Sequence, residues 1–440
     1  MRPLMRFTLR GGRLALPTGI TDGDLRVVDG KIDAIGQVAG DPGEVVDVAG
    51  LMVMPGVIDP QVHFREPGAT HKEDLETGSR ACVAGGVTSF LEMPNTNPPT
   101  TSREAIQDKK NRAAGRARAN YGFFIGATPE NVDELVACDG ACGIKIFMGS
   151  STGSLLVNER NDLDRIFSKG RRLIAVHAED EARLIERYKQ YADRTDPAAH
   201  TEIRDAKAAL LATSLAVELS EKYDRRLHVL HMSTGDEADL LVERGKGDGR
   251  ITCEVLPQHL LLNAPEIYDR IGTRAQMNPP LRAKEHSERL WRGLHEGTVD
   301  CIATDHAPHT LEEKGRGFGN APSGMPGVET SLAVMLDAAH RGQCTVEDVV
   351  RWMTAGPADV YKIVGKGRLK VGFDADLALV DLARTEKVGA RGYFTKSGWS
   401  PFDGMSITGW PVRTYVGGNL AFADNEVLDG VFGGELTYAQ

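Results

Sequence analysis

The fold is decided by the stretch from residue 173 to residue 231, which opens with Leu173-Ile-Ala-Val-His177 and closes with Leu227-His-Val-Leu-His231. Each of these apolar runs has the length of a buried strand and ends on a histidine. Between them, residues 206–222 place alanine and leucine at the i, i+3, i+4, i+7 spacing of a helix. A strand, a helix and a strand in this order predict a parallel β/α unit.

The same alternation continues on both sides of this stretch. The other strand-like runs are Met52-Val-Met-Pro-Gly-Val-Ile-Asp59, Gly86-Val-Thr-Ser-Phe-Leu-Glu-Met93, Tyr121-Gly-Phe-Phe-Ile-Gly126, Gly143-Ile-Lys-Ile-Phe-Met148, Ile251-Thr-Cys-Glu-Val255 and Val299-Asp-Cys-Ile-Ala-Thr-Asp305. Eight such units over about 300 residues predict an α/β protein with a (β/α)8 TIM-like barrel. We assign the barrel to residues 55–365.

The two ends of the chain differ from this middle region. Short apolar runs between turn residues, such as Leu25-Arg-Val-Val28 before the barrel and Val412-Arg-Thr-Tyr-Val416 after it, are typical of a β-meander. We expect residues 1–54 and 366–440 to combine into one small β-sandwich domain.

Composition excludes several classes of protein. The 440 residues carry a net charge of −10, which argues against binding to nucleic acid, because phosphate binding needs clustered cations. No apolar run approaches the roughly 18 residues of a membrane helix, and residues 1–10 lack the apolar core of a signal peptide. The six cysteines are scattered and are expected to be reduced thiols. We therefore expect a cytoplasmic protein, whose ligand, if it is a small anion, must be held by local cations.

Ionisable residues fall at the ends of the barrel runs. His63 follows the first run, Lys145 interrupts an apolar strand, His177 and His231 end two runs, and Asp305 ends the last. The carboxyl ends of barrel strands converge on one mouth, so these side chains are expected to meet. Imidazoles and a carboxylate around an open position form the ligand set of a catalytic zinc site. This pattern predicts metal-dependent hydrolysis, with Asp305 as the acid/base group.

Lys145 lies between Ile144 and Ile146, where an unpaired cation is costly. Two interpretations remain open: an ion-paired lysine inside the barrel, or a lysine carboxylated by carbon dioxide that bridges two metals. The neighbouring histidines and Asp305 favour the bridge. Further along, His309 is a candidate for substrate contact, and the Gly- and charge-rich residues 310–323 predict a mobile loop at the active site.

Several motifs in order carry a family resemblance. They are Pro55-Gly-Val-Ile-Asp-Pro-Gln-Val-His-Phe-Arg-Glu-Pro-Gly68, Met93-Pro-Asn-Thr-Asn-Pro-Pro99, Gly143-Ile-Lys-Ile-Phe-Met148, Val176-His-Ala-Glu-Asp180, Val229-Leu-His-Met-Ser-Thr234 and Ala303-Thr-Asp-His-Ala-Pro-His309. Together they resemble the dihydroorotases of the cyclic amidohydrolase family, over nearly the whole chain.

The resemblance implies reversible cyclisation of N-carbamoyl-L-aspartate to L-dihydroorotate in pyrimidine synthesis, with one or two Zn²⁺ ions per subunit. It implies that His63, carboxylated Lys145 and Asp305 hold the first metal, and that Lys145, His177 and His231 hold the second. The substrate contacts that it implies are Arg65, Asn95, Asn278, His309 and the backbone of Ser323 and Gly324. A guanidinium such as that of Arg65 can bind a carboxylate through two hydrogen bonds.

The chain departs from the family pattern at two points. Gln61 stands where the family's His-x-His motif has its first histidine, and an amide oxygen is generally a weaker zinc ligand than imidazole. We expect Gln61 to be a weak ligand or a lining residue, with the first metal bound less tightly or absent. The strand that contains Lys145 resembles hydantoinases and allantoinases more than those dihydroorotases that place an aspartate there.

Two other functions therefore stay open. A hydantoinase- or allantoinase-like enzyme would act on neutral cyclic ureides, which give the guanidinium of Arg65 no carboxylate to pair with. A catalytically silent homologue would serve as a structural partner of aspartate transcarbamoylase, and Gln61 is its best support. A homodimer is expected only because symmetric dimers are common.

Overall fold

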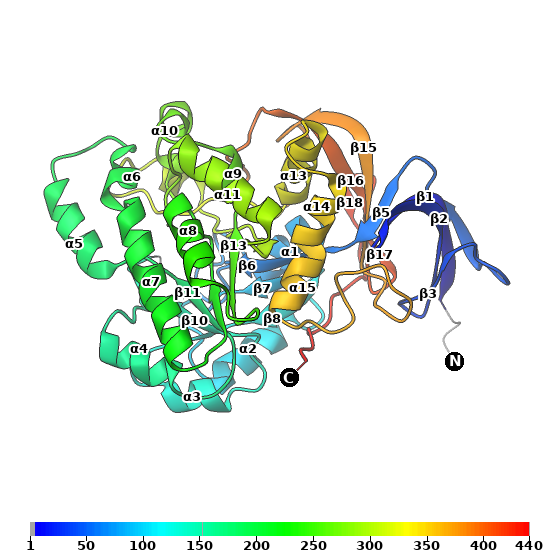
Figure 1. Cartoon of the computed structure of the whole chain (residues 1–440). Coiled ribbons are helices and arrows are strands. Elements are labelled where there is room, and N and C mark those ends of the chain that lie inside the picture. The colour runs from blue at the N-terminus through cyan, green and yellow to red at the C-terminus, as the bar shows by residue number, and fades with distance from the viewer. Residues whose placement is uncertain (1–4, 152, 440) are drawn as a thin grey trace.

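The structure, a computed structural model, describes residues 5–151 and 153–439 (Figure 1). Residues 1–4 of the N-terminal stretch lie outside the described part of the chain. One part of the molecule is a barrel of parallel strands enclosed by helices, and the other is a β-sheet to which both ends of the chain contribute strands. The predicted barrel with a β domain from both termini is confirmed.

The barrel strands follow the predicted order and lie side by side in parallel. They are β6 (Val57–Val62), β7 (Val87–Glu92), β8 (Asn120–Phe123), β9 (Ile125–Gly126), β10 (Ile144–Phe147), β11 (Ile174–His177), β12 (Leu227–Val229), β13 (Ile251–Val255) and β14 (Cys301–Ile302). Strands β6 to β8 form a three-stranded sheet and β9 to β14 a six-stranded sheet. A parallel bridge between Val62 and His306 connects the first strand to the segment after the last, which closes the barrel.

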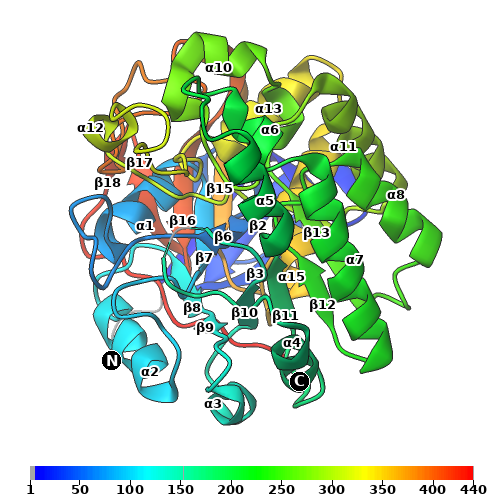
Figure 2. The ribbon, with the colours of Figure 1, turned by 90° about the vertical axis from the view of Figure 1, so that its left-hand side faces the viewer.

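Helices surround these strands (Figure 2). They are α1 (Leu75–Ala84), α2 (Arg103–Ala113), α3 (Val132–Ala137), α4 (Arg160–Phe167), α5 (Glu181–Gln190), α6 (Ala199–Ile203), α7 (Ala206–Lys222), α8 (Gly235–Arg244), α9 (Pro257–Leu261), α10 (Glu266–Ile271), α11 (Lys284–Glu296), α12 (Leu311–Lys314), α13 (Ser331–His340), α14 (Val346–Val350) and α15 (Gly356–Val360). Helix α7 has the predicted bounds. Asp205 caps its first turn by accepting a hydrogen bond from the amide of Ala208, which satisfies one of the free N–H groups there.

The terminal sheet joins strands from both ends of the chain. Its strands are β1 (Arg6–Leu16), β2 (Gly19–Val28), β3 (Lys31–Gly36), β4 (Glu44–Asp47), β5 (Met52–Pro55), β15 (Leu377–Lys387), β16 (Ser406–Val416), β17 (Asn419–Ala423) and β18 (Glu426–Val427). They form one nine-stranded sheet in which β5 lies between β1 and β15. Leu14, Val53 and Leu377 share one buried apolar cluster, so the two ends of the chain depend on each other for a core.

The run from Met52 to Asp59 was predicted to be one barrel strand, and this prediction is wrong. Its first half is β5, which pairs with β1 and β15, and its second half begins β6, which pairs with β7. The break falls at Gly56, where a Cβ atom would clash with the side chain of Thr88. Two adjacent strands that belong to different sheets need this close approach, and glycine permits it.

No helix in the described ranges is long and apolar enough to cross a membrane. The carboxyl ends of β6, β10, β11, β12 and β14 all open on one side of the barrel, where the predicted site residues are located. The terminal sheet packs beside the barrel and contributes no residue to that opening.

Candidate metal centre and substrate pocket

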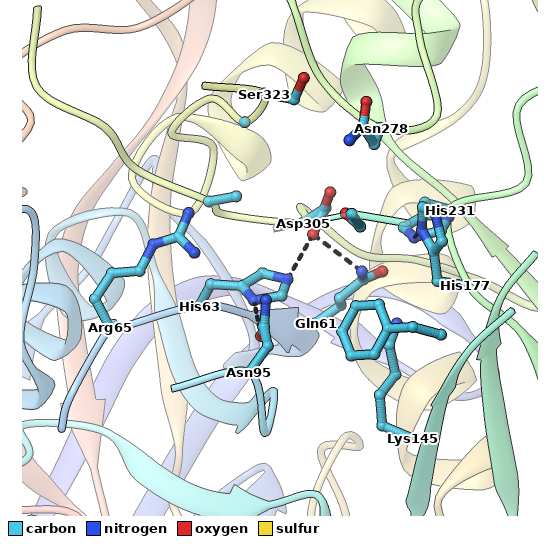
Figure 3. Close-up of a pocket in the computed structure, with 14 residues that line it drawn as sticks. Gln61, His63, Arg65, Asn95, Lys145, His177, His231, Asn278, Asp305 and Ser323 are labelled. Atoms are coloured by element: carbon cyan, nitrogen blue, oxygen red, sulfur yellow. Dashed lines mark hydrogen bonds and ion pairs between the residues drawn. The ribbon is translucent and has the colours of Figure 1, made fainter. Parts of the chain in front are cut away.

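A pocket of about 340 Å³ lies at the mouth of the barrel (Figure 3). The residues that line it are Gln61, His63, Arg65, Asn95, Lys145, Phe147, Ser151, His177, His231, Asn278, Asp305, Ala307, Ser323 and Gly324. The structure thus brings together every predicted site residue except His309, whose ring lies against Arg65 just behind the pocket wall. Phe147, Ser151 and Ala307 are additional lining residues that the sequence reasoning missed.

His177 and His231 face each other across one side of this pocket. His177 Nδ1 lies 3.1 Å from His231 Nε2, and both rings are almost fully buried. Burial is the main cause that lowers the pKa of each ring, so both are neutral imidazoles. Two neutral ring nitrogens that point at each other fit a pair of metal ligands.

Glu179 orients His177 from the side away from the pocket. His177 Nε2 lies 3.0 Å from Glu179 Oε2, and Arg204 pairs with the same carboxylate. Burial raises the pKa of Glu179, but Arg204 and His177 lower it further, so the carboxylate stays ionised. A carboxylate behind a histidine fixes the ring's tautomer and leaves its other nitrogen free as a ligand. Glu179 stands in the quoted motif Val176-His-Ala-Glu-Asp180, but its partner Arg204 carries no comparable signal in the sequence.

Asp305 is the centre of the opposite side of the pocket. Its Oδ1 accepts a hydrogen bond from Gln61 Nε2 at 3.0 Å and lies 3.0 Å from His63 Nε2. His63 Nδ1 lies 2.7 Å from Asn95 Oδ1, which holds the ring in the plane that faces Asp305 (Figure 3). An ionised carboxylate only accepts, so the amide nitrogen of Gln61 must face Asp305, and its buried Oε1 has no hydrogen-bond partner among the described residues.

Lys145 lies between these two groups of side chains. It is 1% exposed, and its Nζ forms no hydrogen bond or ion pair with any residue that the structure describes. Its Nζ lies over the ring of Phe147, 4.5 Å from the ring centroid. Burial lowers the pKa of Lys145 to about 7, against the opposing effects of Asp305 and Glu254. No carboxylate among the described residues forms an ion pair with Lys145, which weakens the ion-paired interpretation. An amine with a lowered pKa that faces two sets of metal donors fits the bridge.

Three functional side chains stand on unusual backbone. Arg65, His231 and Asp305 have φ angles of 61°, 37° and 45°, in the left-handed region that residues other than glycine rarely adopt. Such conformations cost free energy and persist where the surrounding structure enforces them, commonly at functional sites. Behind Asp305, the buried carboxyl of Asp59 accepts a hydrogen bond from Thr304 Oγ1 at 2.5 Å, which ties β6 to the end of β14.

Arg65 supplies the cation that the sequence predicted for an acidic protein. Its side chain is buried, and its Nε donates to the carbonyl of Pro308 at 3.3 Å. Burial is the main cause that lowers its pKa, to about 10, so it remains charged. No carboxylate in residues 5–151 or 153–439 forms an ion pair with it. A buried guanidinium without a carboxylate is costly unless a ligand supplies one.

The other predicted polar contacts lie in the pocket lining or directly beside it. His309 Nε2 lies 3.1 Å from the carbonyl oxygen of Ser323, and Asn278 Oδ1 lies 3.0 Å from His200 Nε2. Gly324 has a φ of 135°, and a Cβ there would lie 2.5 Å from the carbonyl oxygen of Ala307. The backbone of Ser323 and Gly324 can therefore line the pocket only because residue 324 is a glycine.

The loop over residues 310–323 is anchored at several points. It contains the short helix α12, capped by Thr310, and the buried Lys314 donates hydrogen bonds to the carbonyls of Gln276, Pro322 and Gly324 at 2.9, 2.8 and 3.0 Å. Its mobility stays a prediction. Lys314 is another residue that the sequence reasoning missed, because nothing local distinguishes it from a surface lysine.

A second group of side chains that could ligate a metal lies outside the pocket. His228, Glu254 and Cys301 are buried, and their ligand atoms lie within 4.8 Å of one another. His228 already has protein partners for both ring nitrogens, Glu254 Oε2 at 3.0 Å and Thr252 Oγ1 at 2.8 Å. We interpret His228 and Glu254 as a hydrogen-bonded pair inside the barrel, with Cys301 beside it.

The chain is similar to known proteins over most of its length. A model of the amidohydrolase family matches residues 52–421. A dihydroorotase from Halobacterium salinarum is 37% identical over 92% of this chain and 94% of its own length, and one from Bacillus cereus is 33% identical over 96% and 100%. The solved structure of an L-hydantoinase (dihydropyrimidinase) from Arthrobacter aurescens superposes with a TM-score of 0.92 at 32% identity, covering 98% of this chain and 99% of that one. The chain therefore belongs to the amidohydrolase family, as a relative of the dihydroorotases.

Proposed function

We propose that this protein is a zinc-dependent dihydroorotase that reversibly hydrolyses L-dihydroorotate to N-carbamoyl-L-aspartate in pyrimidine biosynthesis. The observation that carries the proposal is Arg65, a buried cation without a carboxylate partner among the described residues, beside a set of metal donors. Dihydroorotate has the two features that such a pocket requires: a cyclic amide to be cleaved and a ring carboxylate to pair with the guanidinium.

The donor set fits a metal. On one side of the pocket, nitrogens of His177 and His231 lie 3.1 Å apart. On the other side, a nitrogen of His63 lies 3.0 Å from an oxygen of Asp305. Lys145 lies between the two pairs. In its neutral form, the amine of Lys145 can attack carbon dioxide, release a proton to solvent and form an anionic carbamate that would bridge the pairs. Zinc held by these residues would polarise the ring carbonyl and lower the pKa of water.

The chain's own residues would supply binding and proton transfer. Asp305 would take a proton from the attacking water and return it to the ring nitrogen that leaves. Gln61 and His63 hold the carboxylate of Asp305 in position. Arg65 would bind the substrate carboxylate, with Asn95, Asn278, His309 and the backbone of Ser323 and Gly324 as further contacts, so that the ring amide faces Asp305.

The two alternatives receive less support. Neutral ureides, the substrates of a hydantoinase or allantoinase, would leave Arg65 unpaired. A silent partner of aspartate transcarbamoylase would not require the convergence of His63, Lys145, His177, His231 and Asp305 on one pocket. The six thiols are free, which supports a reducing compartment such as the cytoplasm, and a homodimer remains our expectation for the assembly.

Turnover of a panel of substrates tests this proposal directly. We expect the purified protein, supplied with zinc and bicarbonate, to interconvert L-dihydroorotate and N-carbamoyl-L-aspartate. Dihydrouracil, hydantoin and allantoin should be much poorer substrates, because they lack the carboxylate. Hydrolysis of any of these neutral rings without turnover of dihydroorotate would contradict the proposal, and so would complete inactivity of the zinc-loaded protein.

Substitution of Arg65 by methionine should mainly raise KM. A charge-assisted hydrogen-bonded contact is worth about 1.5–3 kcal/mol, so we expect KM for dihydroorotate to rise about 10- to 100-fold while kcat changes less. Steady-state kinetics measures both constants. Arg316→Met is the control, because Arg316 is an exposed arginine outside the pocket lining that pairs with Glu312. An unchanged KM in Arg65→Met would remove Arg65 from the carboxylate site.

Substitution of Gln61 by histidine should strengthen metal binding. Imidazole is a better zinc ligand than an amide oxygen, so the variant should retain more zinc per chain than the natural protein during dialysis against a chelator. Zinc content measured by mass spectrometry checks this. Gln258→His is the control, since Gln258 is a buried glutamine outside the pocket that donates to the carbonyl of Thr304. Equal zinc retention in Gln61→His and the natural protein would show that residue 61 does not limit binding.

A further inference from the structure

Lys72 is a partly buried cation that lies outside the pocket lining. Its Nζ lies 3.0 Å from His309 Nδ1 and 3.0 Å from Glu313 Oε1. Lys72 comes from the segment between β6 and α1, whereas Glu313 belongs to α12. The side chains of Lys72, Glu313 and His309 are 16%, 11% and 1% exposed, so both contacts are largely shielded from water.

The contact with Lys72 decides where His309 carries its proton. An ammonium group only donates hydrogen bonds, so Nδ1 of His309 must be the acceptor and Nε2 must carry the hydrogen. The opposite ring edge agrees with this assignment, because Nε2 lies 3.1 Å from the carbonyl oxygen of Ser323, which only accepts. Burial, together with the charges of Arg65, Lys72 and Lys314, lowers the pKa of His309, so the ring stays neutral.

With this tautomer, two hydrogen-bond donors, one on Arg65 and one on His309, lie close together. Arg65 Nη2 lies 3.3 Å from His309 Nε2, and since both nitrogens carry hydrogen, neither can accept from the other. The hydrogen of Nε2 goes to the carbonyl oxygen of Ser323, so the Nη2–H group of Arg65 finds no acceptor on His309 and needs another one. A ligand carboxylate is a suitable one, because each of its oxygens has more than one acceptor position.

We propose that Lys72 is a positioning residue that fixes His309 as an Nε2–H donor and thereby makes the pocket select a ring that bears a carboxylate. The inference rests on the proposed function for the identity of the ring and deepens it with a residue that does not line the pocket. Without Lys72, His309 would be free to carry its hydrogen on Nδ1. Its Nε2 lone pair would then accept from Arg65 Nη2 and take up a donor that the ligand carboxylate needs.

A purely structural role for Lys72 is the competing explanation, since its ion pair with Glu313 also ties α12 to the segment before α1. Glu313→Gln separates the two roles. It removes the ion pair but leaves Lys72 beside His309, and glutamine can still complete the capping box with Thr310. If Lys72 only fastened the loop, Glu313→Gln and Lys72→Met would have the same effect.

Kinetics on the zinc-loaded full-length chain gives the first readout. We expect Lys72→Met to raise KM for dihydroorotate about tenfold, with kcat within about twofold of the natural value, the size of one lost hydrogen bond. Lys72→Arg, which keeps a cationic donor, should restore most of the loss, and Glu313→Gln should keep the natural KM. An unchanged KM in Lys72→Met, or equal changes in Lys72→Met and Glu313→Gln, would overturn the proposal.

The tautomer itself gives a readout that needs no substrate. In protein labelled with ¹⁵N-histidine, the resonances of His309 are identified by their absence in His309→Asn, and their shifts distinguish Nδ1–H from Nε2–H. We expect the Nε2–H form in the natural protein and in Glu313→Gln, and a shift toward Nδ1–H in Lys72→Met. An Nδ1–H ring in the natural protein would refute the assignment. This result is independent of turnover, so it separates failure of the inference from failure of the proposed dihydroorotase activity.

Discussion

Asp305→Asn is expected to lower kcat for both hydrolysis and ring closure by about a thousandfold, within the range that a positioned acid/base group contributes. Asparagine has nearly the same shape and can still accept from Gln61, but it cannot take a proton from water or return one to the ring nitrogen. Initial rates in both directions, with L-dihydroorotate and with N-carbamoyl-L-aspartate, measure the loss. Both rates must fall together, because the same group acts in each direction.

The same carboxylate is also a metal donor, so zinc content must be measured alongside the rates. A rate per bound zinc that falls by the expected amount identifies loss of proton transfer, whereas a natural rate per bound zinc would assign Asp305 to metal binding alone. Asp300→Asn is the matched control. Asp300 lies just before β14, at the opposite end of the strand, where it pairs with Lys246. It should keep the natural kcat, even if it lowers stability.

The convergence of the site was predictable because it depends on the backbone alone. Once the runs that end at His177 and His231 are parallel strands of one barrel, their last side chains must face the same mouth. Lys145 could be singled out because a cation between two isoleucines conflicts with the apolar strand around it. Residues that break a local rule of this kind are often functional.

Contacts between distant segments were not predictable in the same way. Arg204 reaches Glu179, and Lys72 reaches His309, through side chains whose direction depends on how loops pack, and neither pair has a fixed spacing in the chain. The break at Gly56 was missed for a related reason. The apolar run around it is continuous, and only the close approach of Thr88 shows that two different sheets use its two halves.

The role of Gln61 is predictable from the sequence only in part, and the structure adds the rest. The sequence identifies a departure from the His-x-His pattern but gives no direction for the amide. The structure turns the amide nitrogen to Asp305, so one atom of Gln61 supports the carboxylate and leaves the other free to face a metal. A substitution that looks like the loss of a ligand can therefore preserve the orientation of the acid/base group.

Lys145→Ala is expected to abolish tight zinc binding and, with it, measurable turnover. Without the lysine, no carboxylate can form between the His177–His231 pair and the His63–Asp305 pair, and each pair alone offers too few ligands for a tight site. Zinc content after dialysis and turnover of dihydroorotate measure the two losses. Protein supplied with ¹³C-bicarbonate adds a direct observation: a carbamate carbon resonance should be present in the natural protein and absent from the variant.

Lys314→Met is the appropriate control, because Lys314 is equally buried but bonds only to backbone carbonyls outside the metal donors. It should keep both zinc and the carbamate resonance.

The pH dependence of loading gives an independent check on the natural protein. Only the neutral amine reacts with carbon dioxide, and burial lowers the pKa of Lys145 to about 7. At a fixed carbon dioxide concentration, loading of the metal-free protein should therefore be slow below pH 7 and approach a plateau above it, whereas a lysine with the ordinary pKa of about 10.4 would show rates that still rise at pH 9. Full zinc retention in Lys145→Ala, or a carbamate resonance that survives the substitution, would exclude the bridging role.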